Sequence, residues 1–593
     1  MKNNINLYSI CAVAFIFSLG SCKKFLHEEP LSSFSEQAAF DNVPNAKNAV
    51  IGAYSQLAGQ NGYGNAFNNL FAVDSDEWWG TISTSVGDNN VRDLASYNAT
   101  TNNAGLEAPF KRMYVGIERA NICIKNIPGM SLYTNGTTAE KAELKRLYGE
   151  ALTLRAQYLF EVVKVWGDMP AQFVPSADMP DLNIPKMDRD SIYNHLLDDL
   201  LLAQTLVPWR NDAGVAVDER ITKGAVKGLR ARIALFRGGY SLRRANSTYG
   251  QTMARPADYK TYYQIAKTEC AEIMQRRDKH ALNPSFKSVF KDAIDAHKIE
   301  PNGEVMFEVA HAGGGSTTDS KAGYSNGPKV NNRGSNTLIA LPTYFYAFDS
   351  TDTRRDVTIA AYNVNADYTK VGQTLVRMND GKFRRDWFTN PTPSVDDAVQ
   401  YFGINHPLLR FSDVLLMFAE ADNELSNGPT AAAKSAYEEV RLRAFGGNAS
   451  LIGNTPTDYL GFFNAIVNER WLEFGGEGIR KYDLIRWNML AQKLVQARDN
   501  MTKMKDRLAP YNNLPQAVYY KNASFDLLFS ASLYQPSLGS TPTGYTKINW
   551  AATLTPAIIA NTAPGFKPNH SELQPIPQSA LTNNPNLSQD YGY

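Results

Sequence analysis

Two adjacent tryptophans beside acidic residues have the clearest chemical potential in this 593-residue sequence. They end the segment Asp74-Ser75-Asp76-Glu77-Trp78-Trp79, which lies in a polar loop between two helical patterns. Indole rings stack on the apolar faces of sugar rings, and carboxylates accept hydrogen bonds from hydroxyl groups. We therefore predict that Asp74, Glu77, Trp78 and Trp79 bind a ligand. The alternative is that one or both tryptophans lie in the core, because large aromatic side chains are usually buried.

Three further candidates lie later in the chain. Tyr324 and Asn326 belong to His311–Thr337, a polar loop rich in Gly and Asn. A loop of this length is usually either functional or mobile. Trp387 follows two arginines and an aspartate. Both aromatic rings are candidates for stacking on a ligand, with ordinary loop packing as the alternative.

A group of charged residues near the C-terminal helices predicts a structural ion-pair network. Glu469 and Glu473 are one helical turn apart, while Arg480, Asp483 and Arg486 share a face at three-residue spacing. We expect these acids and arginines to interlock and hold two helices together. Five charges without a nucleophile or a metal ligand do not describe an active site.

Motifs of several enzyme classes are missing from the sequence. It has no His-Glu-x-x-His zinc site and no P-loop. A glycosidase needs only two carboxylates about 5–9.5 Å apart, so the 59 acidic residues leave that alternative open. We expect a protein that is not an enzyme and has no cofactor. We also assign no metal ligands, although the acids of Asp74–Glu77 leave calcium open.

Charge and composition narrow the class of partner. The sequence has 60 Lys and Arg against 59 Asp and Glu, a net charge of +1, and this balance argues against a nucleic-acid partner. Hydrophobic residues make up 43% of the chain, so a packed core is expected. The 30 Tyr, 28 Phe and 8 Trp suit surfaces that stack on an uncharged ligand.

The N-terminus is typical of an export signal. Residues 1–21 contain one charged residue, Lys2, and the mainly apolar run Leu7–Leu19, which is shorter than the ~20 residues of a membrane span. The four residues ending at Cys22 resemble the lipobox of bacterial lipoproteins. We predict that Cys22 is lipidated and becomes the first residue of the mature protein. Its acyl chains must provide the membrane anchor, because no polybasic patch is present.

Two cysteines remain in the mature chain, Cys123 and Cys270. Both lie in helical patterns among apolar neighbours. We expect buried free thiols, with a disulfide as the alternative.

Helical periodicity dominates the first half of the chain and returns near its end. In Glu140–Trp166 the apolar residues recur at spacings of three and four, and Gly167 and Pro170 end the pattern. Short turns between such runs predict antiparallel helix pairs. Further helices are predicted at Ser35–Gln60, Leu106–Ile127, Arg189–Leu206, Thr222–Arg237, Tyr259–Gln275, Pro407–Leu425, Ala431–Ala444, Asp458–Phe474 and Gly478–Asp499.

The predicted fold class is mainly α, with long irregular loops and a few short strands such as Glu304–Val309. We divide the chain into a signal peptide (1–21), an N-terminal helical part (22–280), a loop-rich insert with short strands (281–405), a helical part that completes the scaffold (406–507) and an irregular C-terminal wrap (508–593).

Several segments, in order from residue 19 to 593, resemble the SusD/RagB family of bacterial outer-membrane lipoproteins. The segments that carry the resemblance are the lipobox with Phe25–Pro30, Arg155-Ala156 with Trp166–Pro170, Leu409–Phe411 with Leu415–Glu424, the charged stretch Glu469–Trp487, and the ending Leu573–Pro577 with Asn584-Pro585 and Gly592-Tyr593.

The resemblance implies a tetratricopeptide-like scaffold of helix pairs and a non-enzymatic function. It implies a lipid-anchored protein on the exterior of the outer membrane that binds an oligosaccharide and acts as the lid of a SusC-like TonB-dependent transporter. Peptide is the alternative ligand, because one branch of the family binds peptides. The family's ligand contacts lie in variable loops, so Trp78, Trp79, Tyr324 and Trp387 depend on their chemistry alone.

Overall fold

The computed structural model of the chain describes residues 38–80, 87–212, 218–243, 252–335, 337–387, 398–521 and 527–593. The predicted signal peptide and Cys22 lie outside these ranges. Within them, no helix combines the length and the apolar character needed to span a bilayer.

The longest helix, α6 (Thr138–Trp166), shows why the sequence forms these elements. It begins with a capping box, in which the Thr137 hydroxyl accepts from the Glu140 amide and the Glu140 carboxylate accepts from the Thr137 amide. It ends at Gly167, whose φ of 80° lies in the region that favours glycine. The predicted helix Glu140–Trp166 is therefore correct at its C-terminal end and two residues short at its start.

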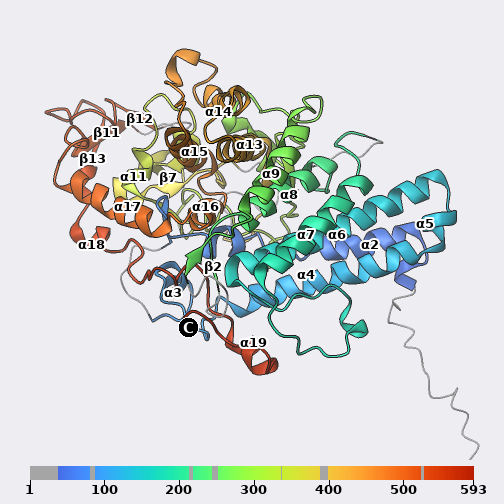
Figure 1. Cartoon of the computed structure of the whole chain (residues 1–593). Helices are drawn as coiled ribbons and strands as arrows, with labels where there is room; N and C mark the ends of the chain where they lie inside the picture. The colour runs from blue at the N-terminus through green and yellow to red at the C-terminus, as the bar shows by residue number, and fades with distance from the viewer. Residues whose placement is uncertain are drawn as a thin grey trace, which may run out of the picture.

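Most of the predicted helices are present, and consecutive helices contact one another, as expected for a stack of helix pairs. In Figure 1 this stack runs from the blue and cyan helices on the right to α13, α14 and α15 at the top. Its helices are α2 (Val43–Tyr54), α4 (Glu107–Asn126), α6, α7 (Arg189–Leu206), α8 (Lys223–Arg237), α9 (Tyr259–Met274), α13 (Phe411–Ser426), α14 (Ala431–Ala444) and α15 (Tyr459–Phe474).

Three predicted helices were wrong in part. Of the described residues of Ser35–Gln60, only Ala38–Phe40 (η2) and Val43–Tyr54 (α2) are helical. Pro407–Leu425 begins as strand β10 (His406–Arg410), because this apolar stretch pairs with β4 (Val305–Val309) before α13 starts. Gly478–Asp499 is broken into α16 (Arg480–Arg486) and α17 (Leu490–Lys505), since Asn488 adopts a positive φ of 57° between them.

Several small antiparallel sheets supplement the helices. The largest has the order β1-β5-β9-β6 and joins β1 (Trp78–Trp79), β5 (Ile339–Ala340), β9 (Asn379–Asp380) and β6 (Ile359–Ala360). The others pair β4 with β10, β7 (Tyr362–Val364) with β8 (Lys370–Gly372), β2 (Ser241–Leu242) with β3 (Met253–Ala254), and β11 (Ala517–Lys521) with β12 (Leu528–Phe529) and β13 (Thr546–Asn549). The fold class is therefore mainly helical with short strands, as predicted.

Short helices complete the structure. They are α3 (Val91–Ala95), α5 (Ser131–Asn135), α10 (Phe286–Ser288), η6 (Val289–Ile294), α11 (Pro342–Phe345), α12 (Arg355–Thr358), α18 (Pro556–Ile559) and α19 (Gln578–Asn583).

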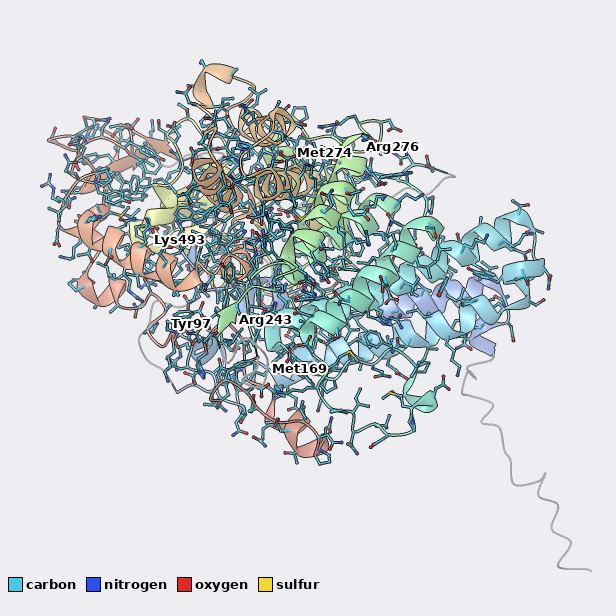
Figure 2. All side chains as sticks on the ribbon, viewed as in Figure 1. Tyr97, Met169, Arg243, Met274, Arg276 and Lys493 are labelled. Atoms are coloured by element: carbon cyan, nitrogen blue, oxygen red, sulfur yellow. The ribbon has the colours of Figure 1, made fainter. Side chains whose placement is uncertain are left out.

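Two large apolar clusters form the core, and side chains fill the space between the helices and the irregular segments (Figure 2). One cluster joins the helices of the stack, and the other lies beneath the four-stranded sheet. Cys123 and Cys270 are buried and unpaired, which confirms the expectation of free thiols. Burial raises the pKa of the Cys123 thiol to about 12, so it is inert at neutral pH.

The C-terminal tail returns to the N-terminal helices. In Figure 1 the red segment passes from α18 on the left to α19, which lies below α4. The Gln574 amide donates to the Val165 carbonyl at 2.9 Å, and the Trp166 indole donates to the Pro575 carbonyl at 3.2 Å. The tail thus binds to the end of α6.

Candidate functional site

The Trp78-Trp79 pair is in the core. The two residues form β1, and only 2% of Trp78 and 0% of Trp79 is exposed. Trp78 packs edge-on against Tyr344, with ring centroids 5.3 Å apart, and the Trp79 indole donates to the Thr562 hydroxyl at 2.9 Å. Neither ring offers a face to a ligand in this structure. The prediction that they stack on a ligand is therefore corrected, because β1 pairs with β5 and both rings are buried in the apolar cluster around this sheet.

The acids of the same segment are buried as well. Asp76 forms a bidentate ion pair with Arg480 at 2.7 and 2.8 Å. Burial raises the pKa of Glu77 to about 8 and raises that of Asp74 well above its usual value. Neither carboxyl reaches solvent, so Asp74 and Glu77 do not form an open ligand site here.

The predicted ion-pair network exists with largely different partners. Of the five residues, only Asp483 and Arg486 pair directly, at 2.7 Å. Arg480 pairs with Asp76 instead. Glu469 and Glu473 do not pair with Arg480 or Arg486, and the segments on either side of Gly475-Gly476 are linked instead by Arg470, which pairs with Asp483 at 2.7 Å.

The two glutamates pair with arginines that the sequence did not indicate. Glu473 accepts from Arg443 at 2.6 Å, from Arg410 at 2.8 Å and from Arg354 at 3.1 Å, and Glu469 accepts from Arg354 at 2.7 Å. Burial would raise the pKa of Glu473, but these arginines hold it well below its usual value. The cluster joins α14, α15, β10 and the start of α12, which is a structural role.

The Asn326 side chain is also buried, and its polar atoms are hydrogen-bonded within the protein. It exchanges hydrogen bonds with Asn69 at 2.8 and 3.2 Å and donates to Asp380 at 3.0 Å. Only 1% of it is exposed, so its predicted contact with ligand is corrected to a loop-anchoring role. Tyr324 is half-buried and packs against the apolar cluster that also contains Trp387.

The same loop contains a spacing that resembles an enzyme motif. Gly323–Gly327 reads Gly-Tyr-Ser-Asn-Gly, the Gly-x-Ser-x-Gly pattern of a nucleophile elbow. That motif requires a strand before the serine and a helix after it, whereas this segment is a run of turns. Ser325 is therefore not placed as a nucleophile.

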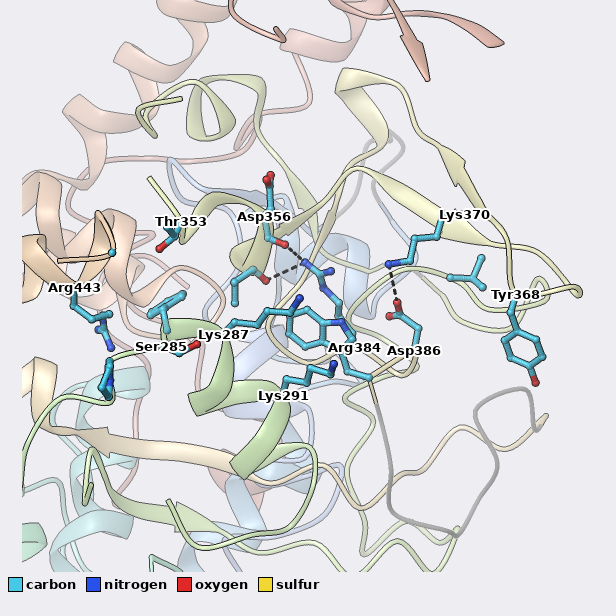
Figure 3. A pocket seen from close by; sticks show the side chains of 16 residues that line it. Ser285, Lys287, Lys291, Thr353, Asp356, Tyr368, Lys370, Arg384, Asp386 and Arg443 are labelled. Carbon is cyan, nitrogen blue, oxygen red and sulfur yellow. Dashed lines mark hydrogen bonds and ion pairs between the residues drawn. The ribbon is translucent and has the colours of Figure 1, made fainter. Parts of the chain in front are cut away.

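Trp387 lines an open cavity of about 760 Å³, which we call the Trp387 pocket. This volume is in the range of small-molecule sites. All of its lining except Arg443 and Gly446 comes from the loop-rich insert (281–405). Figure 3 shows Lys287, Lys291 and Arg384 in the middle of the lining, with Tyr368 at one end and Arg443 at the other. Trp387 is therefore a predicted aromatic residue that borders a cavity.

Trp387 forms part of the pocket wall rather than a broad stacking surface, since 8% of it is exposed. The guanidinium carbon of Arg384 lies 4.1 Å from the Trp387 ring centroid, and the Lys287 ammonium lies 5.6 Å from the same point. The ring thus holds two cations at the pocket by cation–π contacts.

Tyr368 is the exposed aromatic residue of the pocket. It lies at the tip of the β7–β8 hairpin with 48% of its surface exposed and a positive φ of 62°. Such a φ is strained for a bulky residue, and strain of this kind is concentrated at functional sites. The turn is held by the Thr369 amide, which donates to the Asp367 carboxylate at 3.0 Å. No sequence prediction names Tyr368, although polar residues between two short strands are a hairpin signal.

Arg384 is fixed by neutral oxygens. It donates to the carbonyls of Gly381, Asp356 and Val357, and to the Tyr362 hydroxyl at 2.8 Å. Only 3% of it is exposed. Arg384 therefore links three segments of the pocket wall, and none of these hydrogen-bond partners carries a charge.

The described residues do not place the side chains of a metal centre together. Among the ranges that the structure covers, no three His, Cys, Asp or Glu side chains are arranged to hold a metal ion. The side chains that line the Trp387 pocket offer hydrogen bonds, charge and aromatic contact to a ligand.

Comparison with known families yields two matches. Residues 304–593 match the model described as SusD family, and residues 24–235 match the model described as starch-binding associating with outer membrane. A curated relative, SusD-like protein P25 of Formosa agariphila, is 25% identical over 548 residues, covering 85% of this chain and 94% of the relative.

Solved structures show the same fold. A SusD homolog from Bacteroides thetaiotaomicron superposes with a TM-score of 0.75 at 20% identity, covering 94% of this chain and 98% of the other. Surface glycan-binding protein A from the same organism, in complex with laminarihexaose, gives a TM-score of 0.61 at 18% identity, covering 92% and 99%.

Proposed function

Since this chain belongs to the SusD family, whose members are binding proteins without catalytic activity, we propose that it captures an oligosaccharide in the Trp387 pocket. The description of the N-terminal family match supports a glycan-binding protein associated with the outer membrane. The observation that carries the site assignment is the combination of accessible volume and the exposed ring of Tyr368.

The proposed mechanism is stacking and hydrogen bonding. A sugar ring packs on Tyr368 at the hairpin tip, while donors on the pocket wall bind its hydroxyl groups. The pocket is open, so affinity in the micromolar range or weaker is expected. No bond is made or broken.

The chain is further proposed to be anchored by lipid on Cys22, to face the cell exterior and to close over a SusC-like TonB-dependent transporter. The acyl anchor is required because the charge balance of the chain provides no basic membrane-binding surface. Cys22→Ala is expected to move the protein from the outer-membrane fraction to the soluble fraction of cells, whereas retention in the membrane would contradict the anchor. Isolation of the wild-type protein from detergent-solubilised outer membranes tests the transporter, which should co-purify.

Calorimetric titration against a panel of neutral and charged oligosaccharides tests the binding site. Tyr368→Ala is expected to weaken binding by about tenfold, since a stacked ring contributes ~1 kcal/mol or more. Tyr545→Ala, at a half-buried tyrosine outside the pocket, is the matched control. Equal affinity of all three proteins would refute the site. Binding of a casein digest without binding of any glycan would decide for the peptide alternative.

A further inference from the structure

Charge is unevenly distributed around the Trp387 pocket, although the chain as a whole is almost neutral. Its lining contains five basic side chains and two acidic ones. The basic residues are Lys287, Lys291, Lys370, Arg384 and Arg443, and the acidic residues are Asp356 and Asp386.

Both acids already have a cation. Asp356 forms a bidentate pair with Arg355 at 2.8 and 3.0 Å, and Asp386 lies 3.9 Å from Lys370. Asp386 also accepts from the Tyr362 hydroxyl at 2.9 Å. These acids are therefore not available to neutralise the remaining cations of the pocket.

One further cation is neutralised from behind the pocket. Arg443 pairs with Glu304 at 3.0 Å and with Glu473 at 2.6 Å. Lys287, Lys291 and Arg384 remain. Across the described ranges, none of these three lies within ion-pair distance of a carboxylate.

Two buried carboxyl groups, Asp295 and Asp380, also interact electrostatically with Arg384. Burial raises the pKa of Asp295 well above its usual value, and the negative charges of Asp386 and Asp380 raise it further. The Arg384 backbone amide and guanidinium act in the opposite direction and lower that pKa. The side-chain hydrogen bonds of Arg384 go to neutral oxygens.

We propose that the Trp387 pocket selects an anionic oligosaccharide, with a carboxylate or sulfate group bound by Lys287 and Lys291, near the positive charge of Arg384, and a sugar ring on Tyr368. This inference rests on the proposed glycan-binding function and adds the charge class of the ligand. Lys287 and Lys291 are four residues apart on the continuous α10–η6 segment, so both ammonium groups can reach one anionic group. In a concave site, unpaired cations of one sign concentrate ligands of the opposite sign. The almost neutral net charge of the whole chain favours an uncharged ligand, whereas the excess of cations in the pocket favours an anionic one. Salt screens the pocket from charges elsewhere on the chain.

Three short oligosaccharides test the proposal by calorimetry: tetragalacturonate, which carries carboxylates, a sulfated carrageenan tetrasaccharide, and neutral laminarihexaose. We expect one anionic probe to bind about tenfold or more tighter than laminarihexaose. Its affinity should fall steeply between about 50 and about 500 mM NaCl, while that of laminarihexaose stays level. The two anionic probes distinguish carboxylate from sulfate.

The variant Lys287→Gln/Lys291→Gln isolates the two lysines. Both side chains reach solvent, so the fold should be retained. The anionic probe is expected to lose about tenfold in affinity, while laminarihexaose changes less than about twofold. Lys145→Gln, an exposed lysine on α6 outside the pocket, should behave as wild type.

Three outcomes overturn the proposal in distinguishable ways. If laminarihexaose binds as tightly as both anionic probes, glycan binding stands and the charge selection is wrong. If the double variant binds the anionic probe like wild type, the lysines do not bind the anion. If none of the three probes binds, this inference and the proposed glycan-binding function fail together.

Discussion

The guanidinium carbon of Arg384 lies 4.1 Å from the centroid of the Trp387 ring, inside the wall of the Trp387 pocket. This contact joins a cation and an aromatic ring three residues apart. Arg384 simultaneously donates hydrogen bonds to carbonyls of Gly381, Asp356 and Val357. The pocket wall therefore depends on the planar shape of the guanidinium as well as on its charge.

Arg384→Lys keeps the charge and removes the planar fork. We expect the free energy of unfolding to fall by roughly 1–3 kcal/mol, because a lysine ammonium cannot satisfy all these acceptors at once. Affinity for any pocket ligand should fall together with stability. Urea unfolding and calorimetric titration measure the two effects, and a lysine variant as stable as wild type would show that the hydrogen bonds of Arg384 contribute little.

Glu473→Gln should be strongly destabilising. The substitution leaves Arg354, Arg410 and Arg443 in the interior with one carboxylate fewer, and breaking a buried pair costs about 3–5 kcal/mol. Glu439 pairs with Arg277 at the surface of α14 at 2.8 Å, so Glu439→Gln is the matched control and should cost ~1 kcal/mol or less. Denaturant midpoints compare the variants. Similar losses for both would contradict a special role for the buried cluster.

Glu308 is expected to make stability depend on pH. Burial raises its pKa in the folded protein to about 8, and the nearby charges of Asp218 and Glu219 add to this. The folded state therefore binds a proton that the unfolded state has lost between about pH 4.5 and 8, so stability falls as pH rises through that window.

Glu308→Gln removes this proton while keeping the shape of the side chain. The difference in unfolding free energy between the variant and wild type should increase in favour of the variant by roughly 2–4 kcal/mol as the pH rises from about 5 to about 8. Urea unfolding at both pH values measures the gain. Parallel pH profiles for wild type and variant would show that Glu308 is not protonated in the folded state.

Tyr368→Gly should separate stability from binding. Glycine adopts the φ of 62° found here without strain, so the melting temperature should stay level or rise, with a gain of up to ~1 kcal/mol. Affinity for the ligand should fall, because the exposed ring is lost. If the glycine variant melts at a lower temperature and binds like wild type, then Tyr368 is not part of the binding site and its backbone is not strained.

Much of the helical scaffold was predictable because local signals agree. Thr137 and Glu140 form a capping box, the apolar stripe of α6 follows the helical period, and Gly167 ends it. Some of the segments that resemble the family lie in helices: Arg155-Ala156 in α6, Leu415–Glu424 in α13 and Glu469–Glu473 in α15. Strand β10 was missed because a short apolar run does not distinguish a helix from a buried strand.

The sequence by itself determined most of the helices and the family, because these follow from spacing and residue type along the chain. Tertiary structure alone decided which aromatic residues face solvent. Trp78 and Trp79 pair with β5 and are buried, whereas Tyr368 is exposed at a hairpin tip. The tertiary structure also decided which charges are paired. Arg443 forms an ion pair with Glu473, whereas Arg384 donates its hydrogen bonds to neutral oxygens. Burial and ion pairing depend on contacts between residues far apart in sequence, and those contacts set the chemistry of the Trp387 pocket.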